Sequence, residues 1–252
     1  MRLTILGSST PYPRPDNPCS GYLVQHGLTS IWMDAGTGTL GELQRHIDLD
    51  RLDAIWISHG HADHAADLLT AYYALRFADI RRETAVPLIG PPGLVDRLVG
   101  FLGHRSADVI PDVFEITAMN GWGEAVIGEL SLSWAPVDHG MPAYGLRIEA
   151  ADSVLAYSGD SAYCRSLVEL AEDADLFLCE AGISRPVAGE VAVHCTPEDA
   201  ARIAVESRAK RLVLTHIDGS IDWFDAGARA LAIVDTVDLP NPGEVFEVGA
   251  AV

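Results

Sequence analysis

Six consecutive residues, His59-Gly60-His61-Ala62-Asp63-His64, place three imidazoles and one carboxylate within a single short turn. The turn follows the apolar run Ile55-Trp56-Ile57, which predicts a buried strand. Imidazole and carboxylate are the groups with which proteins bind zinc and similar divalent ions. We therefore expect the chain to fold around this cluster and to hold at least one metal there.

The length and composition predict one globular domain. The chain has 252 residues, of which 48% are hydrophobic and 21% are charged, as in ordinary folded domains. It contains no low-complexity tract and no Gly/Ser-rich linker, so we expect residues 1–252 to form a single domain.

The sequence predicts a cytoplasmic protein. It has no run of about 18 apolar residues that could cross a membrane. The apolar run at Leu3–Leu6 is too short for an export signal and predicts a first strand instead. The four cysteines show no C-x-x-C spacing, which favours reduced, buried thiols.

The charge balance limits the partners. Seventeen basic residues against 36 acidic ones give a net charge of −19, whereas long nucleic acids need a basic surface. A small anionic substrate remains compatible, because divalent ions would invert the charge around the site. A homodimer is the common state for soluble oligomers, and we retain it as a possible assembly.

The pattern of apolar runs predicts a mixed α/β fold. Strands are expected at Leu3–Leu6, Gly21–Gln25, Ser30–Met33, Asp53–Ile57, Val86–Ile89, Val113–Ala118, Leu130–Ala135, Tyr144–Glu149, Val154–Tyr157, Leu176–Cys179, Leu212–Thr215 and Val245–Val248. Helices are expected at Leu40–His46, Ala65–Asp79, Gly93–Leu102, Ala162–Ala171, Pro197–Ser207 after the N-cap Thr196, and Phe224–Val234. Two similar halves, each with a sheet and outer helices, favour a four-layer αββα sandwich.

Three further polar residues stand directly after predicted strands. His139, Asp160 and His216 follow the runs Leu130–Ala135, Val154–Tyr157 and Leu212–Thr215. Loops at strand ends present functional groups from a rigid base, so these residues are candidates for the same site as the metal turn.

In its order and spacing, the set resembles the metallo-β-lactamase superfamily. An H-x-H-x-D-H turn is followed by a lone His, a Gly-Asp pair and a strand-end His, and an Asp-x-Gly turn at Asp34 precedes it. The resemblance covers roughly Leu3 to Val248. It implies an αββα metallo-β-lactamase sandwich with the ligands at one edge of the two sheets.

The resemblance also implies two metal sites. One ion would be held by His59, His61 and His139, and the other by Asp63, His64 and His216. Asp160 would bridge the two ions, together with a hydroxide that acts as the nucleophile. Asp34 would orient a ligand imidazole or the turn itself. The expected cofactors are two divalent ions, zinc first, with manganese or iron as alternatives.

Two motifs resemble the tRNA 3′-processing endonuclease (RNase Z) branch of that superfamily. They are Cys179-Glu180-Ala181 and His194-Cys195-Thr196. The resemblance implies that Glu180 and His194 pair, so that the imidazole can protonate a leaving oxygen. With the metal ligand Asp63, these two residues form the predicted catalytic set.

One feature of that branch is missing. The tRNA enzymes carry a long arm between the lone-His and Gly-Asp motifs, but only 20 residues separate His139 from Asp160 here, and two predicted strands occupy them. The motifs Leu6-Gly7-Ser8-Ser9, Ser20-Gly21-Tyr22-Leu23 and Ala156-Tyr157-Ser158-Gly159-Asp160 instead resemble a compact armless group that includes atypical bacterial cyclic-nucleotide phosphodiesterases.

The sequence thus predicts a dinuclear metal-dependent hydrolase, with a small phosphodiester such as a cyclic nucleotide as the leading substrate. Hydrolysis of a lactone, thioester or carboxylic ester on the same metals is the alternative. A tRNA 3′ endonuclease and a non-catalytic metal-binding scaffold are less favoured.

Overall fold

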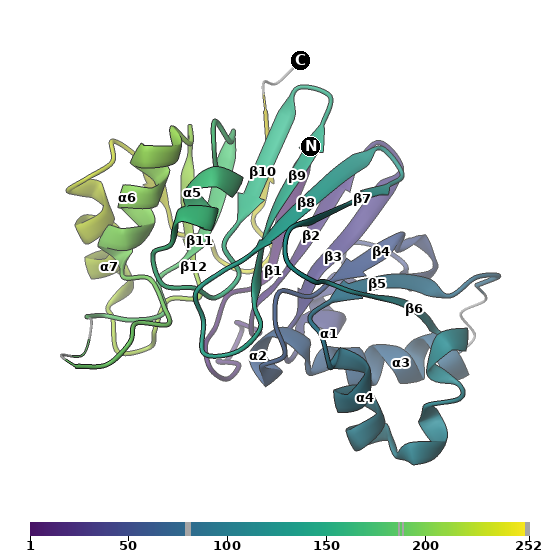
Figure 1. Ribbon diagram of the computed structural model, residues 1–252. Coiled ribbons are helices and arrows are strands. Elements are labelled where there is room, and N and C mark those ends of the chain that lie inside the picture. Colours follow the sequence, from purple (N-terminus) through teal and green to yellow (C-terminus); the bar gives the residue numbers. More distant parts are fainter. Residues whose placement is uncertain (79–81, 186, 188, 250–252) are drawn as a thin grey trace.

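Two mixed sheets of seven strands each pack face to face in the computed structural model, which describes residues 1–78, 82–185, 187 and 189–249 (Figure 1). The strand order of the first sheet is β14-β1-β2-β3-β4-β5-β6, and that of the second is β13-β12-β11-β10-β9-β8-β7. In each sheet one half is parallel and the other antiparallel, with β3 and β10 at the change of direction.

The strands agree with most of the predicted runs. Their bounds are β1 Arg2–Gly7, β2 Gly21–His26, β3 Thr29–Ala35, β4 Ala54–Trp56, β5 Val86–Gly90, β6 Phe114–Ala118, β7 Gly123–Ile127, β8 Leu130–Pro136, β9 Tyr144–Ala150, β10 Ser153–Tyr157, β11 Leu176–Glu180, β12 Leu212–Thr215, β13 Val237–Asp238 and β14 Val245–Glu247. The sequence did not predict β7 or β13. The former is an edge strand with Glu124 and the exposed Val126 on one face, and the latter has only two residues.

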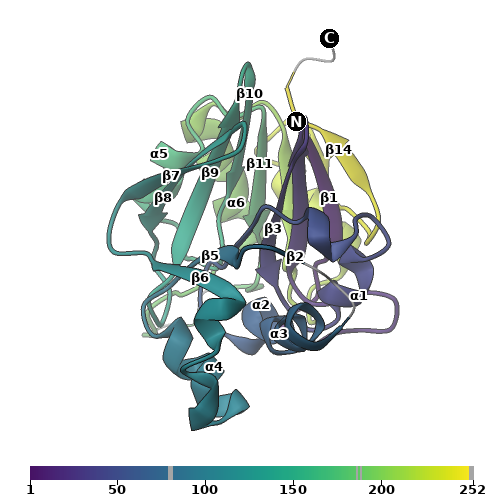
Figure 2. The same ribbon diagram turned by 90° about the vertical axis from the view of Figure 1, so that its right-hand side faces the viewer.

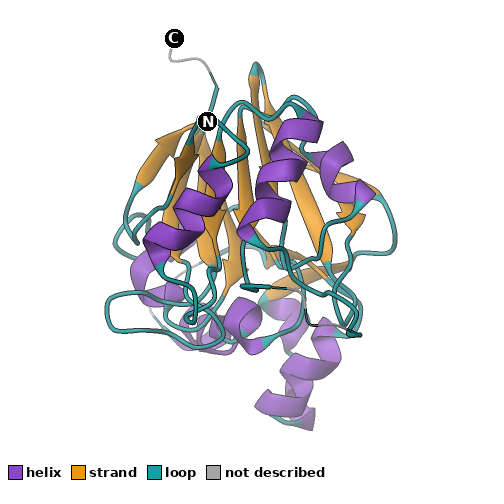
Figure 3. Cartoon of the chain, turned by 90° about the vertical axis from the view of Figure 1, so that its left-hand side faces the viewer, coloured by secondary structure: helices purple, strands orange, loops and turns teal. Residues whose placement is uncertain are grey.

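The helices form the two outer layers. Their bounds are α1 Thr39–Leu43, α2 Ala62–Ala65, α3 Asp67–Phe77, α4 Leu94–Leu102, α5 Arg165–Leu170, α6 Pro197–Ser207 and α7 Trp223–Leu231, with single 3-10 turns at Leu49–Arg51, His104–Ser106 and Ile110–Asp112. Helices α1 to α4 lie on the side of the first sheet (Figure 2), and α5 to α7 cover the outer face of the second (Figure 3).

Three clusters of buried side chains correspond to the three interfaces of this sandwich. In β3, Ile31 and Met33 pack between the sheets, while Trp32 and Ala35 pack against the helices of the first layer. A third cluster joins the second sheet to α5, α6 and α7. Because strand side chains alternate between faces, a strand buried on both sides is apolar at most of its positions. The αββα architecture is therefore confirmed.

Some helix limits differ from the prediction. The helix expected at Ala65–Asp79 is α3, and Asp79 lies outside the described residues. Part of the metal turn forms its own short helix, α2, which contains Asp63 and His64. The start of α6 is as predicted, with a capping box between Thr196 and Asp199. In the described part of the chain, none of the helices has the length and apolar character to cross a membrane.

Candidate metal centre

All the predicted metal ligands come together at one edge of the two sheets. His59 and His61 follow β4, and Asp63 and His64 lie in α2. The second half contributes the residues that follow β8, β10 and β12, which are His139, Asp160 and His216. This edge lies at the end of the sandwich away from the two chain ends (Figure 1).

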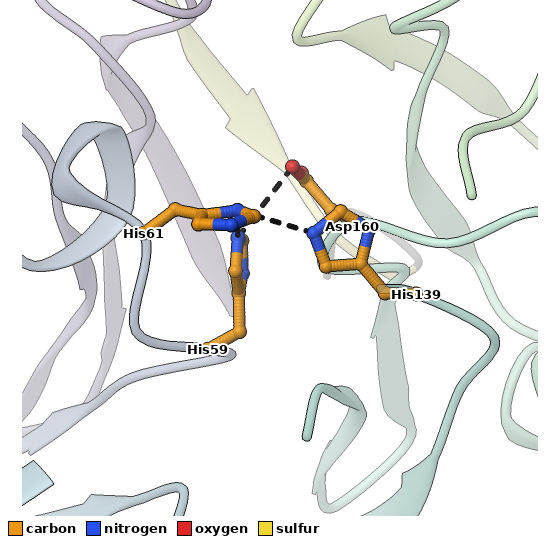
Figure 4. Close-up of side chains that lie close together, drawn as sticks. All are labelled: His59, His61, His139 and Asp160. Carbon is orange, nitrogen blue, oxygen red and sulfur yellow. Dashed lines mark hydrogen bonds and ion pairs between the residues drawn. The ribbon is translucent and has the colours of Figure 1, made fainter. Parts of the chain in front are cut away.

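One group of candidate ligands consists of His59, His61, His139 and Asp160, shown in Figure 4. His61 Nδ1 lies 3.0 Å from His59 Nε2 and 3.2 Å from His139 Nε2. Two ligands bound tetrahedrally to zinc at about 2.05 Å are separated by about 3.3 Å. The spacing of these nitrogens therefore fits a shared ion.

The second group consists of Asp63, His64 and His216, with Asp160 beside it. Asp160 Oδ1 lies 3.2 Å from His64 Nε2, and Asp160 Oδ2 lies 3.3 Å from His216 Nε2 and 3.6 Å from His59 Nε2. Asp160 is thus the residue that touches both groups, as expected of a bridging ligand.

The backbone beside Asp160 is tightly constrained. Gly159 has a left-handed φ of 58°, and a Cβ at this position would lie 2.6 Å from the carbonyl oxygen of Tyr144. Only glycine fits such a position. The Gly-Asp pair is therefore needed to turn the chain at the end of β10 so that the carboxylate enters the site.

Hydrogen bonds fix the outer nitrogens of three candidate ligand imidazoles. Nδ1 of His64 donates to Asp34 Oδ2 at 2.7 Å, and Nδ1 of His139 donates to the Val193 carbonyl oxygen at 2.9 Å. Nδ1 of His59 lies 3.0 Å from Ser58 Oγ, which itself donates to Asp34. With Nδ1 protonated, each Nε2 keeps its lone pair for a metal.

Two buried polar atoms at the centre have no hydrogen bond within the described structure. They are His64 Nε2 and Asp160 Oδ1, which lie 3.2 Å apart. Because buried polar atoms are normally satisfied, this pair indicates that the pocket accepts a cation between them. The residues present therefore fit divalent metal binding.

The pKa shifts of the site histidines agree with divalent metal binding. Burial lowers the pKa of His59, of His139 and of His216, the last to about 4, so these imidazoles are neutral. Burial also lowers the pKa of His64, but the carboxylates of Asp160 and Asp34 outweigh it and raise that pKa well above its usual value. The site thus favours a positive charge where a metal would sit.

Glu180 and His194 lie beside these groups as a pair. His194 Nδ1 donates to Glu180 Oε1 at 2.8 Å and lies 3.9 Å from Asp160 Oδ2. Burial raises the pKa of the Glu180 carboxyl to about 7. Burial lowers the pKa of His194, but the hydrogen bond and charge of Glu180 outweigh it and raise that pKa to about 9. Its ring lies 5.0 Å from that of His139 and 5.9 Å from that of His216, so it borders both ligand groups.

Several supporting residues were not predicted from the sequence. Ser58 joins Asp34 to His59, Tyr157 OH donates to Asp34 at 2.7 Å, and Ser20 Oγ lies 2.9 Å from Nδ1 of His216. Thr10 Oγ1 donates to Asp63 at 3.3 Å. Ser58 and Tyr157 stand next to motif residues, but Asp34, to which both donate, is distant from them in the sequence. Only the fold could identify them.

The family comparison agrees with the fold and the residue pattern. The family described as "Beta-lactamase superfamily domain" matches residues 29–217. An uncharacterized protein of Mycobacterium leprae is 35% identical over 99% of this chain and 89% of its own length. Bacillus subtilis YhfI, a probable metallo-hydrolase, is 27% identical over 86% of this chain and 87% of its own length.

Solved structures share the whole fold. The crystal structure of YhfI has a TM-score of 0.86 at 26% identity and covers 98% of this chain and 99% of its own. The short form of human tRNase Z has a TM-score of 0.79 at 21% identity and covers 99% of this chain and 100% of its own.

Proposed function

Since the chain belongs to the beta-lactamase superfamily of hydrolases and carries a divalent-metal-type His/Asp cluster, we propose that it is a phosphodiesterase of small anionic substrates such as a cyclic nucleotide. The observation that supports this most is the Glu180–His194 pair at the edge of both ligand groups. Phosphodiester cleavage releases an alkoxide that needs a proton, and a supported imidazole can supply it.

The proposed ligand sets follow the two groups described above. One ion would be held by His59, His61 and His139. The other ion would be held by Asp63, His64 and His216. Asp160 would be a ligand of both ions. Two such ions, with zinc as the favoured metal, would supply Lewis acidity and would lower the pKa of a water toward about 7.

The chain's own residues then have distinct tasks. Asp34 accepts the Nδ1 proton of His64 in a hydrogen bond, and the Val193 carbonyl oxygen accepts that of His139. Ser58 orients His59 through its Nδ1. His194 holds a proton on its outer nitrogen while Glu180 stabilises the imidazolium. The proton passes from His194 to the leaving oxygen, and the neutral imidazole that remains is held in place by Glu180.

The connections between strands bear on the size of the substrate. From His139 to Asp160 the chain forms only one loop and the hairpin β9–β10, whose turn joins Ala150 to Ser153. This supports a small substrate, because nothing between these two residues projects to grip a folded RNA.

The experiment measures hydrolysis of 3′,5′-cyclic AMP and of bis-p-nitrophenyl phosphate by protein reconstituted with Zn²⁺ or Mn²⁺. Asp160→Ala should abolish turnover, whereas Asp152→Ala, at the other end of β10, should leave it unchanged. Turnover of lactones or thioesters without any phosphodiester hydrolysis would instead establish an ester hydrolase.

The role of His194 is tested through the leaving group. His194→Ala should slow cyclic AMP hydrolysis about 10²- to 10⁴-fold. Its effect on bis-p-nitrophenyl phosphate should be much smaller, because p-nitrophenolate leaves without a proton. Equal losses on both substrates would contradict the general-acid role.

A further inference from the structure

An arginine from helix α4 reaches the backbone of the metal turn. Arg97 Nη1 donates to the carbonyl oxygen of Gly60 at 3.0 Å. Gly60 stands between His59 and His61, two of the candidate ligands of the first group. The guanidinium therefore lies within one residue of the metal-binding side chains, although α4 contributes no ligand itself.

The glycine in the turn makes this close approach possible. A Cβ on Gly60 would lie 2.9 Å from Arg97 Nε and 3.1 Å from Arg97 Cζ. Any larger residue would push the guanidinium away from the turn. The absence of a side chain at this position thus lets the arginine lie against the backbone of the metal turn, and α2 and α4 lie at the same end of the molecule (Figure 2).

Arg97 keeps most of its hydrogen-bonding capacity. A guanidinium has five N–H donors, and the only acceptor that it meets among the described residues is the Gly60 carbonyl oxygen. The side chain is exposed, so the remaining donors face solvent.

In contrast to many arginines of the chain, Arg97 makes no ion pair with a carboxylate in the described structure. Several other arginines do so, among them Arg45, Arg147, Arg165, Arg208 and Arg229. In a chain with a net charge of −19, a guanidinium that has no acidic partner and borders a metal centre is available for an external anion.

We propose that Arg97 binds an anionic oxygen of the substrate next to the first ligand group and so selects charged over neutral substrates. The inference rests on the proposed phosphodiesterase function. The planar fork of arginine pairs with two phosphoryl oxygens at once, which lysine cannot do. Arg97 is then the residue that distinguishes a phosphodiester from a lactone or neutral ester on the same metals.

Inorganic phosphate serves as the first probe. Calorimetry on zinc-reconstituted protein should show phosphate binding roughly 10- to 100-fold weaker in Arg97→Ala than in the wild type. Arg97→Lys should be intermediate, and Arg45→Ala, which removes an exposed arginine from the turn after α1, should bind phosphate as the wild type does. Unchanged phosphate binding in Arg97→Ala would overturn the inference.

Kinetic measurements distinguish a role of Arg97 in substrate binding from a structural role in holding the metal turn. Arg97→Ala should raise KM for bis-p-nitrophenyl phosphate with little change in metal content or in hydrolysis of the neutral p-nitrophenyl acetate. Loss of zinc, or an equal loss on both substrates, would show a structural role and contradict the proposal. If the wild type binds phosphate through Arg97 but cleaves no phosphodiester, the proposed function fails and the arginine site stands.

Discussion

Asp34 shows how one buried carboxylate can fix a whole group of site residues. Its Oδ2 accepts hydrogen bonds from His64, Ser58 and Tyr157, each at 2.7 Å, although its backbone has the left-handed φ of 55° that costs a non-glycine residue energy. The hydrogen bonds hold the residue in this conformation and, through His64, orient one side of the proposed metal centre.

Asp34→Asn tests this arrangement at the level of one atom. The amide keeps the shape but loses the charge that holds the Nδ1 proton of His64, so we expect zinc affinity to fall about 10- to 100-fold. Titration calorimetry with Zn²⁺ measures the loss. Asp53→Asn is the matched control, because Asp53 accepts from Ser30 N–H at the opposite end of β4. Equal affinities of the two variants would contradict the role of Asp34.

The Glu180–His194 pair leads to a prediction about pH. A general acid works while it is protonated, and Glu180 is the main group that raises the pKa of His194, to about 9. Without the carboxylate, the imidazole loses its proton at lower pH. In Glu180→Gln the alkaline limb of the kcat profile on cyclic AMP should therefore move down by roughly one unit or more. An unmoved limb would exclude His194 as the titrating acid.

Among the secondary-structure elements, α6 has the most clearly encoded beginning. Its capping box satisfies the backbone N–H groups of Thr196 and Asp199 and begins two residues after His194. Thr196→Ala should reduce the free energy of unfolding by about 1 kcal/mol, as measured by urea denaturation. Thr70→Ala in α3, where the hydroxyl donates to the Asp67 carbonyl oxygen, should change it by less than about 0.5 kcal/mol.

The elements also show what sequence patterns can and cannot predict. Strands with apolar residues at their centres, such as β3 and β11, were predicted in the right places, although β3 extends beyond the predicted run at both ends and β11 ends one residue later, at Glu180. The edge strand β7 was not predicted, because its formation depends on pairing with β8 rather than on an apolar pattern of its own. The residues of the site likewise divide into those that a sequence pattern predicts and those that it does not. The ligands stand in a recognisable order, whereas Arg97 comes from a helix whose spacing gives no sign of the contact with Gly60.

For the whole molecule, the proposed metals would join the two halves. The turn after β4 belongs to the first sheet, while His139, Asp160 and His216 follow strands of the second. A ligand that binds only the folded state stabilises it by about 2.7 kcal/mol at 100 times its Kd. Removing metal with a chelator should therefore lower Tm, and added Zn²⁺ should restore it in a concentration-dependent way. The same Tm with chelator and with Zn²⁺ would argue against a metal that bridges the halves.

The pairing of β1 with β14 bears on how the chain is made. Leu3 lies opposite Phe246, and the amino group of Met1 donates to the Val248 carbonyl oxygen at 3.1 Å. A ribosome releases β1 early, but its outer neighbour β14 emerges only after all the other strands have been translated. Until then one edge of β1 stays open, and an open edge can recruit a strand from another nascent chain. Closure of the first sheet is therefore a late event in biosynthesis, and a stalled, unfinished chain would be more prone to self-association than the complete one.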